Sequence, residues 1–505
     1  MSGTKRNGTM KPNKSHSQNQ RGRPGRRKKR SGPNLIRPGF RLGYFDEPPL
    51  AFGHGRHHVD IKTGLTLHGP RSLDQPSLHP DTVRVGIVGS GESIGSARRW
   101  FESCVGGVEG DGDNERFPGC SPSEGFRSRL LFDDRWEEKL TQRELLAVAA
   151  PRLLKDRFDE GLALVTDKLR LLSAKDRPPD YVVLALPDEL LDHCKTVDYK
   201  DEELGRVHRD FRRALKARAM EHRLPTQILL QRVSEAAPGD KGVDHKSRCA
   251  WNLFTSLYFK SGGVPWVPTT LRPGTCYVGI SFYRSLGSYR AHHTQTAMAQ
   301  AFDEHGNGLV LRGPEFVWDE HQHGSPAAHL SAEQAKGLLG EVLRQYQDEM
   351  GQAPSRVVVH KSSRFWPAER EGFEDALTGI GEYDLVSVHF SNEMRLLREG
   401  KYPPLRGTHL SVGDHHFLYT TGFIPSLAVY PHGHVPSPLQ IADHVGDTSV
   451  EELLREMLVL TRMNWNSAGF AGSQPITLRF SKLVGEIMKE IGPDQDPRPQ
   501  FKYYM

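Results

Sequence analysis

The amino-acid sequence predicts an α/β fold with two consecutive domains, and three observations lead to this prediction. The chain has 505 residues, more than one ordinary hydrophobic core organises. Helix and strand patterns alternate over residues 83–260, as in a doubly wound parallel sheet. Beyond residue 271 several strands come before the helices, so the second half has a different topology.

The junction between the two halves lies within residues 251–284. A helical pattern runs from Trp251 to Lys260 and ends on Ser261-Gly262-Gly263, which is a typical helix C-cap. After a linker rich in Pro and Thr, an apolar strand begins at Cys276. We therefore expect one domain to end, and the next to begin, near residue 270.

Composition indicates a water-soluble protein of a reducing compartment. Hydrophobic residues make up 36% and charged residues 26% of the chain. No apolar run reaches the roughly 18 residues of a membrane span, and the N-terminus lacks an apolar signal-peptide core. The five cysteines are scattered without a CxxC pair, which argues against a zinc site or a disulfide framework. We expect a cytoplasmic protein that makes no membrane contact.

The net charge of +5 comes from one end of the chain. Residues 1–40 hold twelve Lys and Arg and no acid, and the rest holds 55 basic and 62 acidic residues. Residues 1–38 are polar and rich in Gly and Pro, so we predict a disordered basic tail. Such a tail neutralises nucleic-acid phosphates or forms a solvated extension, and composition leaves both interpretations open.

The first domain begins with a loop-rich lead-in and a strand over residues 83–88. The strand runs into Gly89, Gly91 and Gly95, a spacing that is found in phosphate-binding turns. No acidic residue follows at the end of a second strand to hold a ribose. An ordinary connection between strand and helix is therefore favoured over a dinucleotide site.

Basic residues gather on the next elements. We expect helices over 142–172 and 202–221 and strands over 181–186 and 227–230. His208 and Arg212 are four residues apart and share a face of the expected helix, which Lys216 continues. With Gln227 at the start of the following strand, these groups could converge on an anion. Spacing alone favours a solvated basic face.

The order of strand and helix patterns in the second half predicts a ribonuclease H-like fold. Three strands in a meander precede a helix with Ser331 as its N-cap, and a buried strand follows. Antiparallel strands, a crossover helix and a parallel strand are the order of that fold. The expected strands are 277–284, 295–302, 308–312, 356–360, 384–390 and 417–421, and the expected helices are 331–349, 449–465 and 477–491.

Histidine-rich stretches in the second half are weak candidates for metal sites. His415 and His416 follow Asp414, and a second run extends from Asp319 to His323. Neither has the HExxH spacing of a zinc helix, so solvated loop histidines are the favoured interpretation. Asp303 is expected in a hairpin turn, together with Glu304.

Several motifs together resemble the C-terminal half of prokaryotic Argonautes. They are PTQILLQ, WNLFTSLYFKSGGVPW, TCYVGISFYR, RVVVHKSSRF, YPPLRGTHL, LYTTGFIP and LTRMNWNS. The resemblance covers roughly residues 40–505. It implies a Rossmann-like MID domain with its lead-in over 39–270 and a ribonuclease H-like PIWI domain over 271–505. No room remains for N and PAZ domains, so the chain resembles a short prokaryotic Argonaute.

The resemblance implies a site for the 5′-phosphate of a guide strand. The family's phosphate-binding positions match His208, Arg212, Gln227 and Lys260. The resemblance also implies that a terminal carboxylate, here that of Met505, binds Mg²⁺ or Mn²⁺ beside the phosphate. Further contacts to the guide or target backbone are expected from Lys216, Lys361, Arg364 and Arg406.

The same resemblance implies that the chain does not cut nucleic acid. A cleaving PIWI site holds two Mg²⁺ ions through clustered carboxylates. At the matching positions this chain has Ser281, Ser362 and the pair Asn464 and Asn466. Hydroxyl and amide groups do not supply the negative charge that fixes two divalent ions.

The implied function is sensing in prokaryotic antiviral defence, with abortive infection as the outcome. Short Argonautes bind a small guide RNA, pair it with complementary single-stranded DNA and act with an APAZ-containing effector of TIR, Sir2 or nuclease type. The expected complex is a heterodimer, or a higher oligomer on activation. Two alternatives stay open: a guided nuclease with unusual ligands such as His415, Asp303 or Glu315, and a nucleic-acid-binding protein that acts alone through its tail.

Overall fold

A computed structural model describes residues 39–505 except 203–204, 238, 285–293, 319–320, 322–323, 326, 392, 431–434 and 493–494. Residues Phe40–Met505 form one compact unit, so the expected boundary near residue 270 stays a prediction. The basic tail over 1–38 and most of the run Asp319–His323 lie outside the described residues. Within the described part, no helix combines the length and apolarity needed to cross a membrane.

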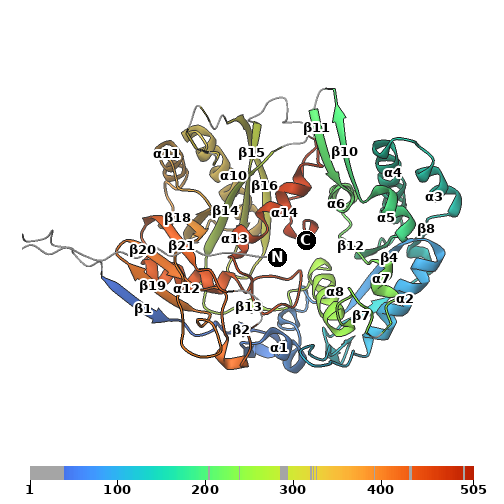
Figure 1. The fold of residues 1–505 in the computed structure, drawn as a ribbon, viewed down its shortest axis with the longest axis horizontal. Coiled ribbons are helices and arrows are strands. Elements are labelled where there is room, and N and C mark those ends of the chain that lie inside the picture. The colour runs from blue at the N-terminus through green and yellow to red at the C-terminus, as the bar shows by residue number, and fades with distance from the viewer. Residues whose placement is uncertain are drawn as a thin grey trace, which may run out of the picture. The chain divides into compact units, whose positions relative to one another are not determined.

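The first half builds a parallel sheet with β4 (Thr82–Gly89) at its centre. β7 (Arg129–Leu131) and β8 (Glu137–Lys139) pair with one side of β4, and β9 (Tyr181–Ala185) and then β12 (Thr226–Ile228) follow on the other. Hydrophobic cores lie on both faces of this sheet, which confirms the doubly wound arrangement. The main helices around it are α2 (Gly91–Val105), α3 (Gln142–Ala149), α4 (Leu154–Ser173), α6 (Phe211–Glu221) and α8 (Lys246–Lys260) (Figure 1).

The glycine turn after β4 serves packing. A Cβ atom on Gly89 would lie 2.3 Å from the main-chain oxygen of Ala185 in the neighbouring strand. Ser90 then caps α2 by accepting from the main-chain nitrogen of Ser93. Local packing and a helix cap therefore account for this stretch without a bound ligand.

The helix expected over 202–221 is wrong in its first half. Residues 196–210 form a hairpin of β10 (Thr196–Asp201) and β11 (Gly205–Asp210), and α6 begins only at Phe211. Val197 and Val207 are buried while the residues beside them are exposed, the alternation of a half-buried strand. Asp210 caps α6 through the main-chain nitrogen of Arg213, which fixes where the helix starts.

The second half contains a nine-stranded sheet whose core confirms the ribonuclease H-like fold. β14 (Thr275–Tyr283), β15 (Thr294–Phe302) and β16 (Gly308–Val317) are antiparallel, and β17 (Arg356–Lys361) and β18 (Glu382–Phe390) continue parallel to β14. α10 (Ala332–Met350) and α11 (Pro367–Ala376) pack on one face of the sheet. The other face is covered by α12 (Val450–Leu460), α13 (Ile476–Arg479) and α14 (Ser481–Met488) (Figure 1).

Four strands extend this sheet beyond β18, and the sequence predicted one of them in part, over residues 417–421. β21 (Leu439–Gly446), β20 (His415–Leu418) and β19 (Thr408–Val412) follow β18, and β1 (Phe40–Tyr44) forms the edge. The start of the lead-in therefore belongs to the second sheet. A short pairing of β2 (Leu50–Ala51) with β13 (Val267–Pro268) adds a further contact between the lead-in and the junction.

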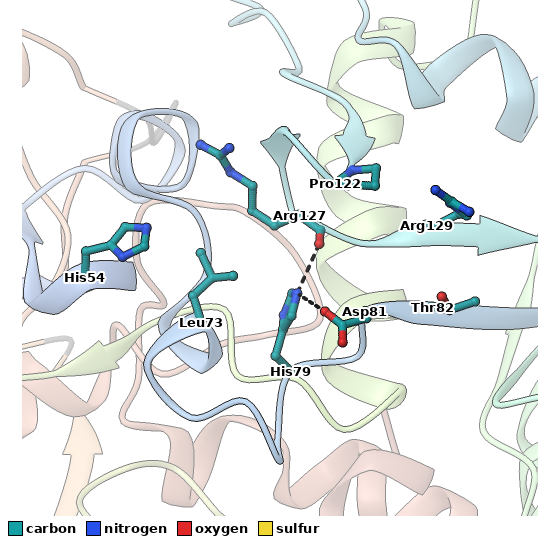
Figure 2. Close-up of a pocket in the computed structure, with 8 residues that line it drawn as sticks. All are labelled: His54, Leu73, His79, Asp81, Thr82, Pro122, Arg127 and Arg129. Carbon is teal, nitrogen blue, oxygen red and sulfur yellow. Dashed lines mark hydrogen bonds and ion pairs between the residues drawn. The ribbon is translucent and has the colours of Figure 1, made fainter.

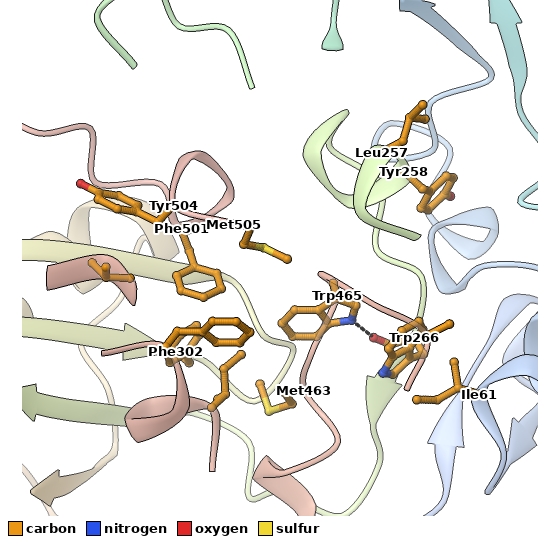
Figure 3. Close-up of a cluster of buried hydrophobic side chains, with 14 of the residues drawn as sticks. Ile61, Leu257, Tyr258, Trp266, Phe302, Met463, Trp465, Phe501, Tyr504 and Met505 are labelled. Carbon is orange, nitrogen blue, oxygen red and sulfur yellow. Dashed lines mark hydrogen bonds between the residues drawn. The ribbon is translucent and has the colours of Figure 1, made fainter. Parts of the chain in front are cut away.

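A shared aromatic core lies beside the last residues of the chain, as Figure 3 shows. Trp465 donates from Nε1 to the main-chain oxygen of Trp266 (3.0 Å), which joins the segment after α12 to the junction. Phe501 and Met505 are buried in the same core. The short helix η5 (Phe501–Tyr503) contacts α6, α8 and β16, so elements of both halves hold the end of the chain in place.

Candidate functional site

A small basic pocket lies between α6, β12 and the last residues of the chain. Its volume is about 100 Å³. Arg212 and Lys216 reach it from successive turns of α6, because residues four apart share a helix face. Its lining residues are Leu184, Arg212, Leu215, Lys216, Thr226, Gln227, Ile228, Asn466, Leu483 and Met505.

Lys260 supports this pocket from the C-terminal end of α8. Its side chain is only 1% exposed. The ammonium group donates to the main-chain oxygen of Thr226 (3.1 Å) and to Oε1 of Gln227 (2.9 Å). Because Oε1 of Gln227 is engaged, the amide NH₂ group is the part of that side chain left to donate to a ligand.

Burial disfavours the charged forms of the two lysines at the pocket. It lowers the pKa of Lys216 to about 7, with the Arg212 charge as a second cause. Burial also lowers the pKa of Lys260 strongly, with further effects from Lys216 and Arg212. Within the described residues, no acidic side chain pairs with any of these three cations. Lys216 instead donates to the main-chain oxygen of Met505. The pocket is therefore built to receive an anion.

His208 does not join the other predicted residues. It lies on β11 with 55% of its side chain exposed, and its Nδ1 is 3.0 Å from Oδ1 of Asp198 across the hairpin. The expected helical face linking His208 to Arg212 does not exist, because α6 begins three residues after His208. Lys216 lines the pocket beside Arg212; the sequence predicted it as part of the basic face and as a contact to the nucleic-acid backbone. The four-residue spacing of Arg212 and Lys216 was the available signal.

Two of the predicted nucleic-acid backbone contacts are buried inside the protein. Lys361 is 1% exposed and pairs with Glu369 at 2.5 Å. Arg406 is fully buried and pairs with Glu47 at 2.9 Å. Their charges hold elements together and are out of reach of a bound strand, which corrects the expectation. Arg364 is exposed just after β17 and stays a prediction.

Ser281 and Ser362 lie at matching positions along neighbouring parallel strands. Ile280 of β14 is in register with Lys361, the last residue of β17, so Ser281 within β14 and Ser362 just after β17 are the next residues along. Among the described residues, the buried Oγ atom of Ser281 has no hydrogen-bond partner. The resemblance expected Asn466 beside these serines, but Asn466 lines the basic pocket instead. Asn464 donates to Oγ of Ser467 (3.0 Å).

The other metal candidates have structural partners. Asp303 accepts from the main-chain nitrogens of His305 and Asn307, which places it in the expected turn. His415 is bonded to Gln440 and His416 to Ser411. Among the described residues, no group of three His, Cys, Asp or Glu side chains could hold a metal ion.

The residue predicted to bind a divalent cation lines the basic pocket. The main-chain oxygen of Met505 accepts from Lys216. Mg²⁺ and Mn²⁺ favour anionic oxygen ligands, which a terminal carboxylate at Met505 would supply. The cation at this place stays a prediction.

Comparison with known proteins yielded one sequence relative and several similar structures. No protein-family model matches the chain. It is 31% identical to an Argonaute from Thermus thermophilus over 164 residues, which is 31% of this chain and 21% of that protein.

Two solved structures share the fold at low identity. Clostridium butyricum Argonaute bound to a guide DNA and a 19-mer target DNA matches with a TM-score of 0.61 and 15% identity, over 92% of this chain and 55% of that one. The A. aeolicus Argonaute matches with a TM-score of 0.56 and 15% identity, again over 92% and 55%. The chain thus spans about half the length of these structures. The chain is therefore similar to an Argonaute in sequence over one segment, and similar to Argonautes in fold over most of its length.

Proposed function

We propose that this chain binds the 5′-phosphate of a short guide strand in the basic pocket and pairs that guide with complementary DNA. The observation that carries the proposal is the convergence of Arg212, Lys216 and Lys260 without an acidic side chain as partner among the described residues. A phosphate monoester brings the negative charge and the acceptor oxygens that this set lacks. The likeness to an Argonaute bound to guide and target DNA supports the same conclusion.

Each pocket residue has a distinct part in this proposal. Arg212 and Lys216 face the phosphate from α6 and neutralise it. The amide NH₂ group of Gln227 donates a hydrogen bond to the phosphate. Lys260 holds that amide in place through Oε1 and adds positive charge behind it. His208 has no part, because its strand carries it away from the pocket.

We further propose that recognition and response lie on different chains. Serines at 281 and 362 supply no anionic metal ligands at the strand ends where the resemblance places cleavage. The chain then acts as a sensor in prokaryotic defence, with a guide RNA and an APAZ-containing effector as its partners. Base pairing supplies the sequence specificity, and the protein reads the shape of the duplex.

The first test is a binding measurement on the purified chain. Fluorescence anisotropy compares one short RNA with a 5′-phosphate and with a 5′-hydroxyl, and a DNA pair of the same sequence. We expect the phosphate to raise affinity roughly 10- to 100-fold, as charge-assisted hydrogen bonds do. Lys260→Met should remove this preference. Arg218→Met is the control, because Arg218 lies on α6 outside the pocket and pairs with Glu221.

The second test separates sensing from cleavage. The chain is co-expressed with the protein encoded beside it, and matched or mismatched single-stranded DNA is added to the purified complex. Loss of NAD⁺ or of bystander nucleic acid on matched DNA only is the expected result. Equal affinity for both 5′ ends, or Mg²⁺-dependent target cutting by this chain alone, would refute the proposal.

A further inference from the structure

A second, larger cavity lies between the lead-in and the loop before β7. Its volume is about 520 Å³, which is in the range of sites for small ligands. It shares no lining residue with the basic pocket. The short helices η1 (Gly53–Gly55) and η2 (Arg71–Asp74) form one wall, and the start of β4 forms another. The lining residues are His54, Leu73, His79, Asp81, Thr82, Pro122, Arg127 and Arg129 (Figure 2).

Positive charge dominates this cavity. Neither Arg127 nor Arg129 forms an ion pair within the part of the chain that the structure describes. The guanidinium of Arg127 donates to the main-chain oxygen of Ser123, and its Nε is buried without a partner. The acid in the lining is Asp81, whose side chain is 89% exposed.

The neighbouring segment adds to this positive field. Burial lowers the pKa of His68 in this segment, and the charges of Arg56, His58 and His54 lower it further. A cavity beside such a segment attracts anions from solution.

Backbone strain is stored at two lining positions. His54 and Arg127 have φ angles of 60° and 56°, and they are two of the four non-glycine residues with positive φ among the described residues. The main-chain nitrogen of His54 donates to Asp74 (2.5 Å). The main-chain oxygen of Arg127 is bonded to Nε2 of His79 (3.0 Å), as Figure 2 shows. Strained residues that the surrounding structure holds in place cluster at ligand sites.

We propose that this cavity binds a phosphate-bearing ligand of nucleotide size, at a site separate from the basic pocket. Arg127 contacts the phosphate, because a planar guanidinium group binds two of its oxygens, and Arg129 adds positive charge from the other side of Pro122. The Asp81 carboxylate accepts from ribose hydroxyl groups, and Leu73 and Pro122 give apolar contact. The ligand's phosphate comes from a free nucleotide or from an internal nucleotide of a bound strand.

His79 links the lining of this cavity to helix α8. Its Nδ1 is bonded to the hydroxyl of Tyr258 (2.8 Å) on α8. Its Nε2 is bonded to the main-chain oxygen of Arg127 and lies 3.3 Å from Oδ1 of Asp81. Both ring nitrogens are therefore used in positioning, and His79 is a positioning residue that does not contact the ligand.

The test uses the full chain loaded with a 5′-phosphorylated RNA, so that the basic pocket is occupied. Calorimetric titration with AMP should show one further site, and adenosine should bind at least about tenfold more weakly because it lacks the phosphate. Arg127→Met and Arg129→Met should each weaken AMP about tenfold. The control Arg116→Met should leave AMP binding unchanged, because Arg116 pairs with Glu109 outside the cavity. If guide loading fails, AMP is titrated into the Lys260→Met variant, in which the basic pocket is impaired. AMP binding by this variant then reports on the second cavity and not on the proposed guide site.

Arg127→Gly distinguishes ligand binding from folding. Glycine adopts positive φ without strain, so this variant should keep or raise the melting temperature while losing AMP affinity. A 5′-hydroxyl oligonucleotide that displaces AMP assigns the site to a strand, and one that does not displace it assigns the site to free nucleotides. Absence of AMP binding, or AMP binding that survives both arginine substitutions, overturns the proposal.

Discussion

At the scale of single residues, the buried lysines of the basic pocket lower the stability of the folded protein. Lys216 and Lys260 are held in a poorly solvated place with Arg212 beside them, and burial lowers the pKa of both lysines. A protein selected for stability alone would have apolar groups or an acid there. The pocket therefore has the signature of a binding site.

Arg212 and His208 should differ sharply in their effects. Arg212→Met removes a charge that lines the pocket, so affinity for a 5′-phosphorylated RNA should fall roughly 10- to 100-fold. His208→Ala changes an exposed strand residue paired with Asp198 and should change affinity less than about threefold. Anisotropy with the phosphorylated RNA measures both. A large loss of affinity in His208→Ala would show that His208 contributes to phosphate binding.

Lys216→Met should make the unliganded protein more stable. The pKa of Lys216 is about 7 in the folded chain and 10.5 when unperturbed, so between these values unfolding takes up a proton. The wild-type lysine therefore destabilises the fold increasingly as pH falls from 10.5 towards 7. Methionine fills the space without a charge, and we expect about 1 to 3 kcal/mol of added stability near pH 7. Urea unfolding at pH 7 and pH 9 tests this, and the gain should shrink at pH 9.

The affinity for phosphate should fall as pH rises above about 7. Lys216 is half protonated near that pH in the free protein, and a bound phosphate raises its pKa by attraction. Binding is then accompanied by proton uptake, and affinity drops by up to about tenfold per pH unit above 7. Lys216→Met should show a shallower profile. A flat wild-type profile from pH 7 to 9 would contradict this role for Lys216.

At the scale of elements, a buried charge cluster fixes the end of β17. Glu369 of α11 accepts from Lys361, from His329 and from the main-chain nitrogen of Leu330. These hydrogen bonds join β17, α11 and the segment before α10. The loop that carries Ser362 starts from this anchored strand end.

Removing one charged residue of this cluster should lower the stability of the protein more than removing both Glu369 and Lys361. Glu369→Leu leaves Lys361 charged and buried, at a cost of about 3 to 5 kcal/mol. Adding Lys361→Met removes the unpaired charge and should restore part of the stability. Chemical denaturation of the two variants gives the comparison. If both proved equally unstable, packing would outweigh charge at this position.

Secondary structure was predictable where its signals are local. Ser331 caps α10 as expected, and the meander of β14, β15 and β16 follows from apolar strands with turn residues between them. The β10–β11 hairpin was not predicted. Its residues are mostly polar or charged, so too few apolar positions remain to show whether the hydrophobic pattern repeats as in a strand or as in a helix. Asp210 was the overlooked signal, since it caps the true start of α6.

At the scale of the whole molecule, the end of the chain joins the two halves beside the pocket. η5 contacts α6, α8 and β16, and Met505 presents its main-chain oxygen to Lys216. Distant segments thus form one site, and residues more than 200 positions apart line the same cavity.

Phosphate recognition should survive removal of divalent metal. Arg212 and Lys216 line the pocket and Lys260 supports it through Gln227, so these three residues already neutralise the ligand. We expect the preference for a 5′-phosphate over a 5′-hydroxyl to change less than about threefold between buffers with Mg²⁺ and with EDTA. Anisotropy in both buffers measures this. Loss of the preference in EDTA would show that a metal ion is required at the 5′ end.

The sequence by itself determined the α/β class and the order of most elements, because periodicity, caps and turns are local properties. Only the tertiary structure decided that Lys361 and Arg406 are buried in ion pairs, that Lys216 and not His208 lines the pocket beside Arg212, and that β1 joins the second sheet. These outcomes depend on contacts between residues far apart in the chain. Burial and charge pairing arise when distant segments pack together, and no local pattern encodes them.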